Sequence, residues 1–152
     1  MKYWNEFITR EDLENEAGEI DENIVRALSI NTGIRYLGEF IELGGNDLPY
    51  TASDHVEELM TKDIMYYVHA TENRIPSSEE IRAYMKKPEN VEIQKYWTFV
   101  SVNATKENWP EFVKKIREKW NIPEEVTLKN EKLINQKLEV LASENGIKAS
   151  EL

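Results

Sequence analysis

The sequence predicts a mainly α-helical protein made of two small helix-turn-helix-like units in tandem, followed by a C-terminal helix. Three observations lead to this prediction. Apolar residues recur along most of the chain with the spacing of one helix face. Capping signatures precede several of these segments. The order of the segments also repeats after about 72 residues, which is typical of an internal duplication.

The first half of the chain predicts a series of short helices. The apolar side chains of residues 4–8 follow a helical spacing. Thr9 stands three residues before Asp12, as in a capping box, and the helix that follows is expected to end at Gly18. The short carboxylate of Asp21 can cap the next helix. The predicted helices begin at residues 4, 9, 21 and 36 and end at residues 8, 18, 33 and 43.

The second half predicts longer helices after a linker. Residues 44–54 concentrate glycine, proline and short polar side chains, and Ser53 or Asp54 is expected to cap the next helix. Ser77 and Glu80 form a full capping box. The composition of residues 91–102 favours a strand. Four of their apolar side chains nevertheless fit the i, i+3, i+4, i+7 spacing of a helix without exception, so we expect a helix; these are Ile93, Tyr96, Trp97 and Val100. The last helices are expected at residues 110–120 and 124–145.

Corresponding segments suggest a division of the chain into units. Residues 24–28 correspond in pattern to residues 96–100, and residues 37–41 correspond to residues 109–113. We therefore interpret the chain as two related units and a final helix that packs on the second of them. The expected parts are an acidic helical unit at residues 1–48, a basic helical unit at residues 54–122 and a C-terminal helix at residues 123–152.

Charge is distributed unevenly along the chain. The formal net charge is -10, which argues against a protein that binds nucleic acid over its whole surface. Residues 1–59 hold 4 basic and 14 acidic side chains, whereas residues 60–152 hold 15 of each sign. Residues 74–120 have 10 basic against 7 acidic side chains. The two parts are therefore expected to have different electrostatic roles, or to be ordinary solvated helix faces.

One series of motifs resembles a known family. A Pro-Ser-x-Glu-Glu-aliphatic motif at residues 76–81 precedes an aromatic-rich helix at residues 91–102 and a Trp-x-x-Phe helix at residues 109–112. This order resembles the small helical repeat found beside homing endonucleases of the HNH type, over residues 60–122 and loosely over residues 8–45. The resemblance implies helix-turn-helix-like units that contact DNA. It implies no catalytic residue, and the glycine of the family's Phe-Gly-Ser-Trp turn is missing here.

The sequence holds no motif of a catalytic, metal or cofactor site. The chain has no cysteine, which excludes disulfides and zinc-thiolate centres. Its two histidines, His55 and His69, do not have the spacing of known metal motifs, and no phosphate-binding glycine loop or nucleophile elbow occurs. We therefore expect a non-enzymatic protein without a cofactor. No apolar run is long enough to cross a bilayer and the start lacks a signal-peptide core, so a cytoplasmic location without membrane association is expected.

Two binding hypotheses follow from the charge pattern. In the first, a helical module contacts nucleic acid, or a protein of nucleic-acid metabolism, through basic residues of the segment 74–120. These residues are Arg74, Arg82, Lys86, Lys87, Lys95, Lys114, Lys115 and Arg117. In the alternative, an acidic inhibitor or adaptor of phage or plasmid type binds a basic protein surface through residues 1–59. Its acidic face consists of Glu11, Asp12, Glu14, Glu16 and Glu19. The basic residues are also consistent with i, i+4 pairs on an exposed helix, and the acidic residues with a solvated face.

Overall fold

Seven α-helices and one short 3-10 helix make up the part of the chain that a computed structural model describes, residues 4–45 and 52–148. These residues hold no β-strand, only an isolated bridge between Glu14 and Ile20. The prediction of a mainly α-helical fold is confirmed. The elements are η1 Trp4–Phe7, α1 Arg10–Leu13, α2 Glu22–Glu42, α3 Ala52–Glu72, α4 Ser78–Lys86, α5 Pro88–Asn103, α6 Trp109–Trp120 and α7 Glu124–Glu144.

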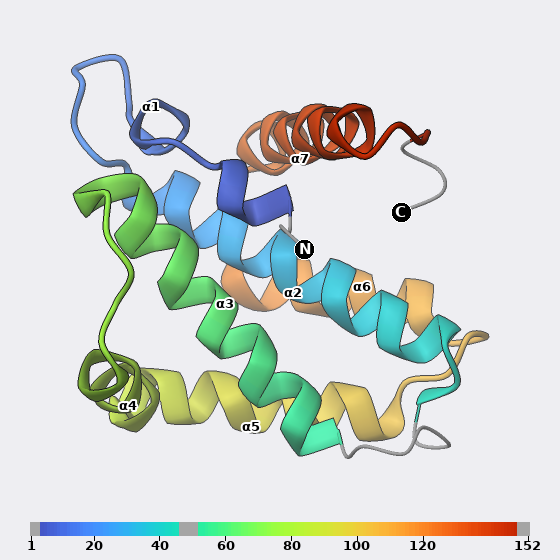
Figure 1. Ribbon diagram of the computed structural model, residues 1–152. Coiled ribbons are helices and arrows are strands. Elements are labelled where there is room, and N and C mark those ends of the chain that lie inside the picture. The colour runs from blue at the N-terminus through green and yellow to red at the C-terminus, as the bar shows by residue number, and fades with distance from the viewer. Residues whose placement is uncertain (1–3, 46–51, 149–152) are drawn as a thin grey trace.

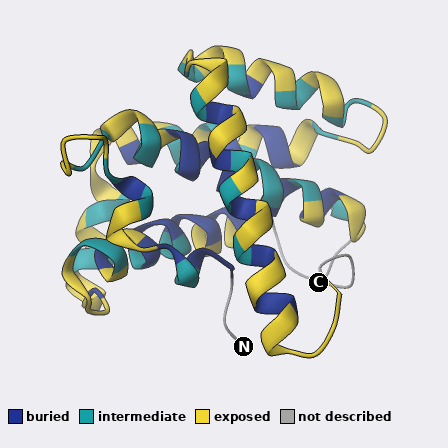
Figure 2. Ribbon diagram, turned by 90° about the horizontal axis from the view of Figure 1, so that it is seen from above, coloured by how far each residue is buried: buried dark blue, intermediate teal, exposed yellow. Residues whose placement is uncertain are grey.

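The helices are arranged around α2 and α3. Figure 1 shows α5 along one side of the molecule with α4 at its end, α7 on the opposite side, and α2 and α3 between them. Buried and exposed residues alternate along the helices with the helical period (Figure 2), as expected for amphipathic helices that share a core. Within the described ranges, no helix is long and apolar enough to cross a membrane.

The predicted capping signals fix several helix starts. The backbone N–H of Thr9 donates to Oδ2 of Asp12 over 2.9 Å, and Oδ1 of Asp21 accepts from the backbone N–H of Asn23 over 2.8 Å. Before α4, the Ser77 hydroxyl oxygen accepts from the backbone N–H of Glu80 over 3.2 Å. Each bond satisfies an N–H that the first turn of a helix leaves without a partner. The expected helix at residues 91–102 is also confirmed, as the central part of α5.

The predicted break in the middle of the first half is wrong. Residues 21–33 and 36–43 were expected to form two helices, but α2 runs without interruption through Gly33 and Gly38. Both glycines lie against tryptophans. A Cβ at Gly33 would come 2.5 Å from Cζ2 of Trp97, and a Cβ at Gly38 would come 3.3 Å from Nε1 of Trp109. The glycines therefore allow close packing of indole rings against the helix backbone rather than ending the helix.

Two other predicted boundaries also differ from the structure. The helix after Thr9 ends at Leu13 and not at Gly18, because the chain then turns, with Asn15 Oδ1 accepting from the backbone N–H of Ala17 over 2.9 Å. The helix that Ser53 or Asp54 was expected to cap already begins at Ala52, so both residues lie in its first turn. Residues 46–51 of the predicted linker lie outside the described residues.

The hydrophobic core extends across the expected unit boundary. One cluster combines Leu37 of α2 with Met60 of α3, Trp97 and Val100 of α5, and Ile116 of α6. All five side chains are buried. Residues of 1–48 and 54–122 therefore share one core, and the described residues do not form two separate bundles.

The C-terminal helix packs on a different part of the chain from the one predicted. Helix α7 was expected to lie on the second unit, but its main contacts are with α2 and η1. Ile134 and Leu138 of α7 share a cluster with Trp4 and Leu28. The physical reason is that the apolar side of α7 covers these first-half residues, which would otherwise face water.

The tandem arrangement is only partly visible in the helix order. Helices α3 and α7 each have 21 residues and begin 72 residues apart, as the repeat predicts. Helix α2 is continuous, however, whereas the corresponding stretch of the second half is divided into α5 and α6. Helix α3 packs on both α2 and α5. The helix-turn-helix character of two independent units stays a prediction.

Candidate functional site

The predicted basic residues are spread over three helices and their connections, and some of them are occupied by ion pairs. Arg74, between α3 and α4, contacts Glu80 over 2.7 Å and Glu72 over 3.3 Å. The hydrogen bonds from Arg74 and from the Ser77 backbone lower the pKa of Glu80 from 4.5 to about 2. Lys95 on α5 lies 3.7 Å from Glu92. These ion pairs account for the charges of Arg74 and Lys95 without a bound ligand.

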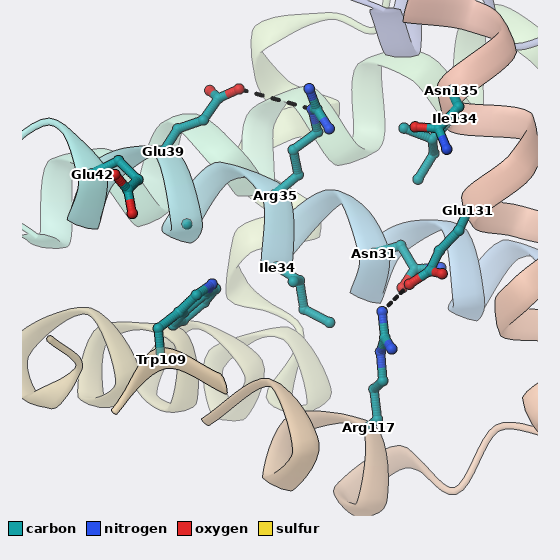
Figure 3. Close-up of a pocket in the computed structure, with 11 residues that line it drawn as sticks. Asn31, Ile34, Arg35, Glu39, Glu42, Trp109, Arg117, Glu131, Ile134 and Asn135 are labelled. Carbon is teal, nitrogen blue, oxygen red and sulfur yellow. Dashed lines mark hydrogen bonds and ion pairs between the residues drawn. The ribbon is translucent and has the colours of Figure 1, made fainter. Parts of the chain in front are cut away.

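Arg117 is engaged with a residue of another helix. It forms an ion pair with Glu131 of α7 across a pocket of about 500 Å³ between α2, α6 and α7 (Figure 3). On the α2 side of the same pocket, Arg35 lies 3.8 Å from Glu39, and Glu42 adds a further carboxylate. The two guanidinium groups are thus matched by three carboxylates. The pocket has no excess positive charge, and Arg117 connects α6 to α7.

The remaining predicted basic residues divide between two places. Arg82 and Lys86 are exposed on α4, and Lys87 is exposed between α4 and α5. Lys114 and Lys115 are exposed on α6. The structure therefore does not bring all eight residues together into one patch.

A smaller group on α5 and α6 combines lysines with aromatic rings. The rings of Phe99 and Phe112 meet edge to face with centroids 6.5 Å apart. Lys115 Nζ lies 5.7 Å from the centre of the Phe112 ring, and Lys119 Nζ lies 4.7 Å from the centre of the Tyr96 ring. These distances are typical of cation-π contacts. We call these five residues the lysine-aromatic seam.

The seam presents an exposed aromatic side chain to solvent. Phe99 is 56% exposed, whereas Trp97 on the same helix is only 3% exposed. Burial raises the pKa of Tyr96, so its hydroxyl stays protonated at neutral pH. Of the charged residues nearby on α6, Glu111 and Glu118 are exposed as well. The seam can offer ring faces and ammonium groups to a ligand, in a surrounding of mixed charge.

Sequence reasoning missed the aromatic part of this seam. The sequence prediction used the apolar stripe of the helix at residues 91–102. That stripe assigned Tyr96 to the core and gave Phe99 no role. One weak signal was present. Phe99 falls outside that stripe, on the solvent side of the helix, but a single exposed apolar side chain is common on protein surfaces and does not by itself indicate a contact surface.

The predicted acidic face is partly engaged within the molecule. Oδ2 of Asp12 lies 3.1 Å from Nζ of Lys137 on α7, and Oε1 of Glu14 accepts a hydrogen bond from Nε of Arg10 over 2.8 Å. The exposed members of the set are Glu11, Glu16 and Glu19. Glu16 and Glu19 belong to the loop between α1 and α2, which projects from the molecule (Figure 1).

Neither histidine belongs to a cluster of possible metal ligands. His55 is buried, its Nε2 lies 2.9 Å from the carbonyl oxygen of Tyr36, and its ring stacks on Phe40 with centroids 4.7 Å apart. His69 is exposed near the end of α3. In the described ranges, no group of three or more histidine, cysteine or carboxylate side chains is arranged to hold a metal ion.

Known proteins give no further guide to this site. Comparisons with protein-family models, curated proteins and solved structures found no match. The resemblance to the helical repeat beside HNH-type homing endonucleases therefore stays a prediction. The functional argument depends on the geometry of the site alone.

Proposed function

We propose that this protein is a non-enzymatic binding module that holds single-stranded nucleic acid on the lysine-aromatic seam of α5 and α6. The observation that carries the proposal is the combination of an exposed Phe99 with two lysines held over neighbouring aromatic rings. Proteins that bind single strands without strong sequence preference use this combination, because every base can stack on a ring and every phosphate can pair with an ammonium group.

The small number of rings and charges in the seam supports contact with a short stretch of nucleic acid. Phe99 offers a ring for one base, and Tyr96 flanks the position of Lys119. Lys115 and Lys119, with Lys114 exposed on the same helix, supply two or three charges for phosphates. The affinity should therefore fall only moderately with salt, since each neutralised phosphate of a single strand contributes a slope of about -0.7 in log K against log salt.

The test is a fluorescence anisotropy titration of the whole chain with a labelled oligothymidylate at several salt concentrations. Phe99→Ala should weaken binding about tenfold, because loss of one base stacking on an aromatic ring costs about 1 to 3 kcal/mol. The double substitution Lys115→Gln and Lys119→Gln should weaken binding and flatten the salt slope.

The matched control is the double substitution Lys129→Gln and Lys132→Gln. It removes the same charge from exposed positions of α7, on the far side of the molecule from α5 (Figure 1). It should leave the affinity nearly unchanged. Equal weakening by both double variants would show that binding depends on net charge and not on the seam. Absence of binding to single strands at low salt would refute the proposal.

The acidic alternative has narrower support. Glu11, Glu16 and Glu19 are exposed and take no part in the ion pairs made by Asp12 and Glu14, and the last two lie on the projecting loop. If a basic protein is the partner, neutralising Glu16 and Glu19 should abolish its capture, while the Lys115 and Lys119 substitutions should not.

A further inference from the structure

A second cavity, of about 630 Å³, lies between α2, α3, α4 and the adjoining parts of α5 and α6. Its lining meets the lysine-aromatic seam at Trp120, whose ring lies edge-on to that of Tyr96 with centroids 5.3 Å apart. Of the basic residues predicted to bind nucleic acid, only Lys87 lines it. Its polar and aromatic lining includes Ser29, Asp63, Tyr66, Tyr67, Tyr84 and Trp120. Such a combination of ring surfaces and a few polar groups is typical of small-molecule sites.

Asp63 is the unusual residue of this cavity. Its side chain is buried, with a residue exposure of 8%. Oδ2 accepts two hydrogen bonds, from the Ser29 hydroxyl over 2.7 Å and from the Tyr84 hydroxyl over 3.0 Å. Oδ1 is also buried and has no hydrogen-bond partner of ordinary geometry among the described residues. Oδ2 is thus well satisfied, whereas Oδ1 lacks a hydrogen bond of ordinary geometry and the Tyr66 hydroxyl is the one further donor that acts on the carboxylate among the described residues.

Burial and hydrogen bonding act on Asp63 in opposite directions. Desolvation raises the pKa of its carboxyl group, while the hydrogen bonds from Ser29, Tyr84 and the nearby Tyr66 hydroxyl lower it. A buried carboxylate oxygen without a donor is costly. A positively charged group beside the carboxylate would offset the cost of burying its negative charge.

The rest of the cavity suits an apolar or aromatic body. Trp120 stacks on the buried Trp97 with ring centroids 5.5 Å apart, and Tyr67 on the opposite side is 38% exposed. Three charged side chains also line the cavity: Glu22 and Arg26 from α2, and Lys87. All three are exposed, whereas Asp63 is buried, so the one charge at the inner end is negative.

We propose that this cavity binds a small organic amine, with the ammonium group beside the carboxylate of Asp63 and the hydrocarbon body against the tyrosine and tryptophan rings. A carboxylate only accepts hydrogen bonds, so a ligand must bring the donor. A cation also gains from the aromatic lining, whose ring faces attract positive charge. An anion would instead meet the buried carboxylate.

The test uses 2-phenylethylamine as the probe and 2-phenylethanol as its uncharged counterpart, added to the full chain. Binding is followed by calorimetry and by the indole N–H signals in nitrogen-proton NMR spectra. The amine should shift the signal of Trp120, which lines the cavity, and of its stacking partner Trp97. Trp4 and Trp109 do not line it, and their signals should stay in place. The alcohol should bind at least about tenfold more weakly, since hydrogen bonds to charged groups are the strong ones.

Asp63→Asn should reduce amine affinity by about tenfold or more. Its amide oxygen can still accept from Ser29 and Tyr84, so the fold should be kept, which circular dichroism checks. Glu139→Gln on the exposed side of α7 removes the same charge and should leave amine binding unchanged.

Three results would overturn the proposal: equal binding of the alcohol, full retention of amine binding in the folded Asp63→Asn variant, or no saturable shift of the Trp97 and Trp120 signals. The NMR readout on the unmodified chain decides the matter if the Asp63→Asn variant does not fold. Trp120 also contacts Tyr96 and Lys119 of the lysine-aromatic seam. Neither the amine probe nor the Asp63→Asn substitution tests nucleic-acid binding at Phe99, however, so failure here leaves the proposed function untouched.

Discussion

Gly33 and Trp97 together determine how α5 packs on α2. A glycine in a helix interior costs about 1 kcal/mol relative to alanine. Packing offsets this cost, because the six-membered ring of Trp97 lies against the helix backbone at the place that a side chain of residue 33 would occupy. Trp97 in turn is 3% exposed and belongs to the core shared by α2, α3, α5 and α6.

Replacement of Gly33 by alanine should therefore destabilise the protein. The new Cβ would lie 2.5 Å from Cζ2 of Trp97, and the buried ring cannot move without disturbing the core. We expect a loss of about 1 to 3 kcal/mol in the free energy of unfolding, as is usual for overpacking. Gly38→Ala is the matched control, because its Cβ would come no closer than 3.3 Å to the partly exposed Trp109. Urea unfolding of both variants checks this, and equal stabilities would contradict it.

Asp63 is a second residue whose role depends on distant partners, because its carboxylate is buried within the fold. It lies on α3 between Met60 and Ile64, on the buried side of an amphipathic helix. Its spacing from Met60 and Ile64 puts a carboxylate on the apolar side of this helix. Its hydrogen-bond partners on α2 and α4, however, come from positions 34 residues before and 21 residues after it, and no local pattern identifies them.

At the scale of elements, the stability of α4 depends on contacts at its N-terminus. None of the residues of this nine-residue helix is buried, so packing contributes less to it than to the other long helices. Ser77 and Glu80 form a complete capping box there, and Arg74 contacts Glu80 as well. These contacts compensate for the small amount of apolar surface that α4 covers.

Glu80→Gln should destabilise the protein at neutral pH, because glutamine can keep the capping box but loses the charge that pairs with Arg74. The folded-state pKa of Glu80, about 2, lies below the ordinary value of 4.5. A lowered carboxyl pKa contributes stability that is present above 4.5 and is lost as the pH falls to about 2. The stability difference between wild type and variant should therefore shrink over that pH range.

Urea unfolding at a series of pH values measures this difference. The neighbouring substitution Glu79→Gln is the control, since Glu79 is exposed and makes no ion pair with Arg74. A difference for Glu80→Gln that stays constant as the pH falls would show that the ion pair is not its source.

At the scale of the whole molecule, the first and second halves complete each other's cores. Leu37 packs with Met60 and Trp97, while Leu28 packs with Ile134 of α7. A side-chain hydrogen bond of 3.0 Å between Asn31 and Asn130 joins α2 to α7 within this packing. Every long-range part of the core therefore includes residues of α2.

A fragment of residues 54–122, the expected basic unit, should for this reason not fold alone. Without α2, the buried side chains of Val56, Trp97 and Val100 would lose one wall of their cluster. Large core truncations of this kind exceed the few kcal/mol by which a small domain is stable. Circular dichroism and NMR dispersion of the fragment check this. A cooperatively folded fragment would instead support independent units.

A single sequence is enough to predict the local features of this structure. The helical class, the capping boxes at Thr9 and Ser77, and the helix at residues 91–102 all follow from spacing and from groups within one or two turns of each other. Such interactions are encoded by neighbouring residues, so one chain is enough to identify them. The uneven distribution of charge is likewise a property of the sequence alone.

What each residue does depends on contacts that form in the tertiary structure. The sequence alone predicts that Gly33 ends a helix and that Arg117 binds a ligand, but Trp97 lies against Gly33 and Glu131 pairs with Arg117. The same holds for the side of the molecule on which α7 packs. These outcomes depend on partners from distant parts of the chain, and whether a helix residue faces solvent, a core or a cavity is set by the element that happens to cover it.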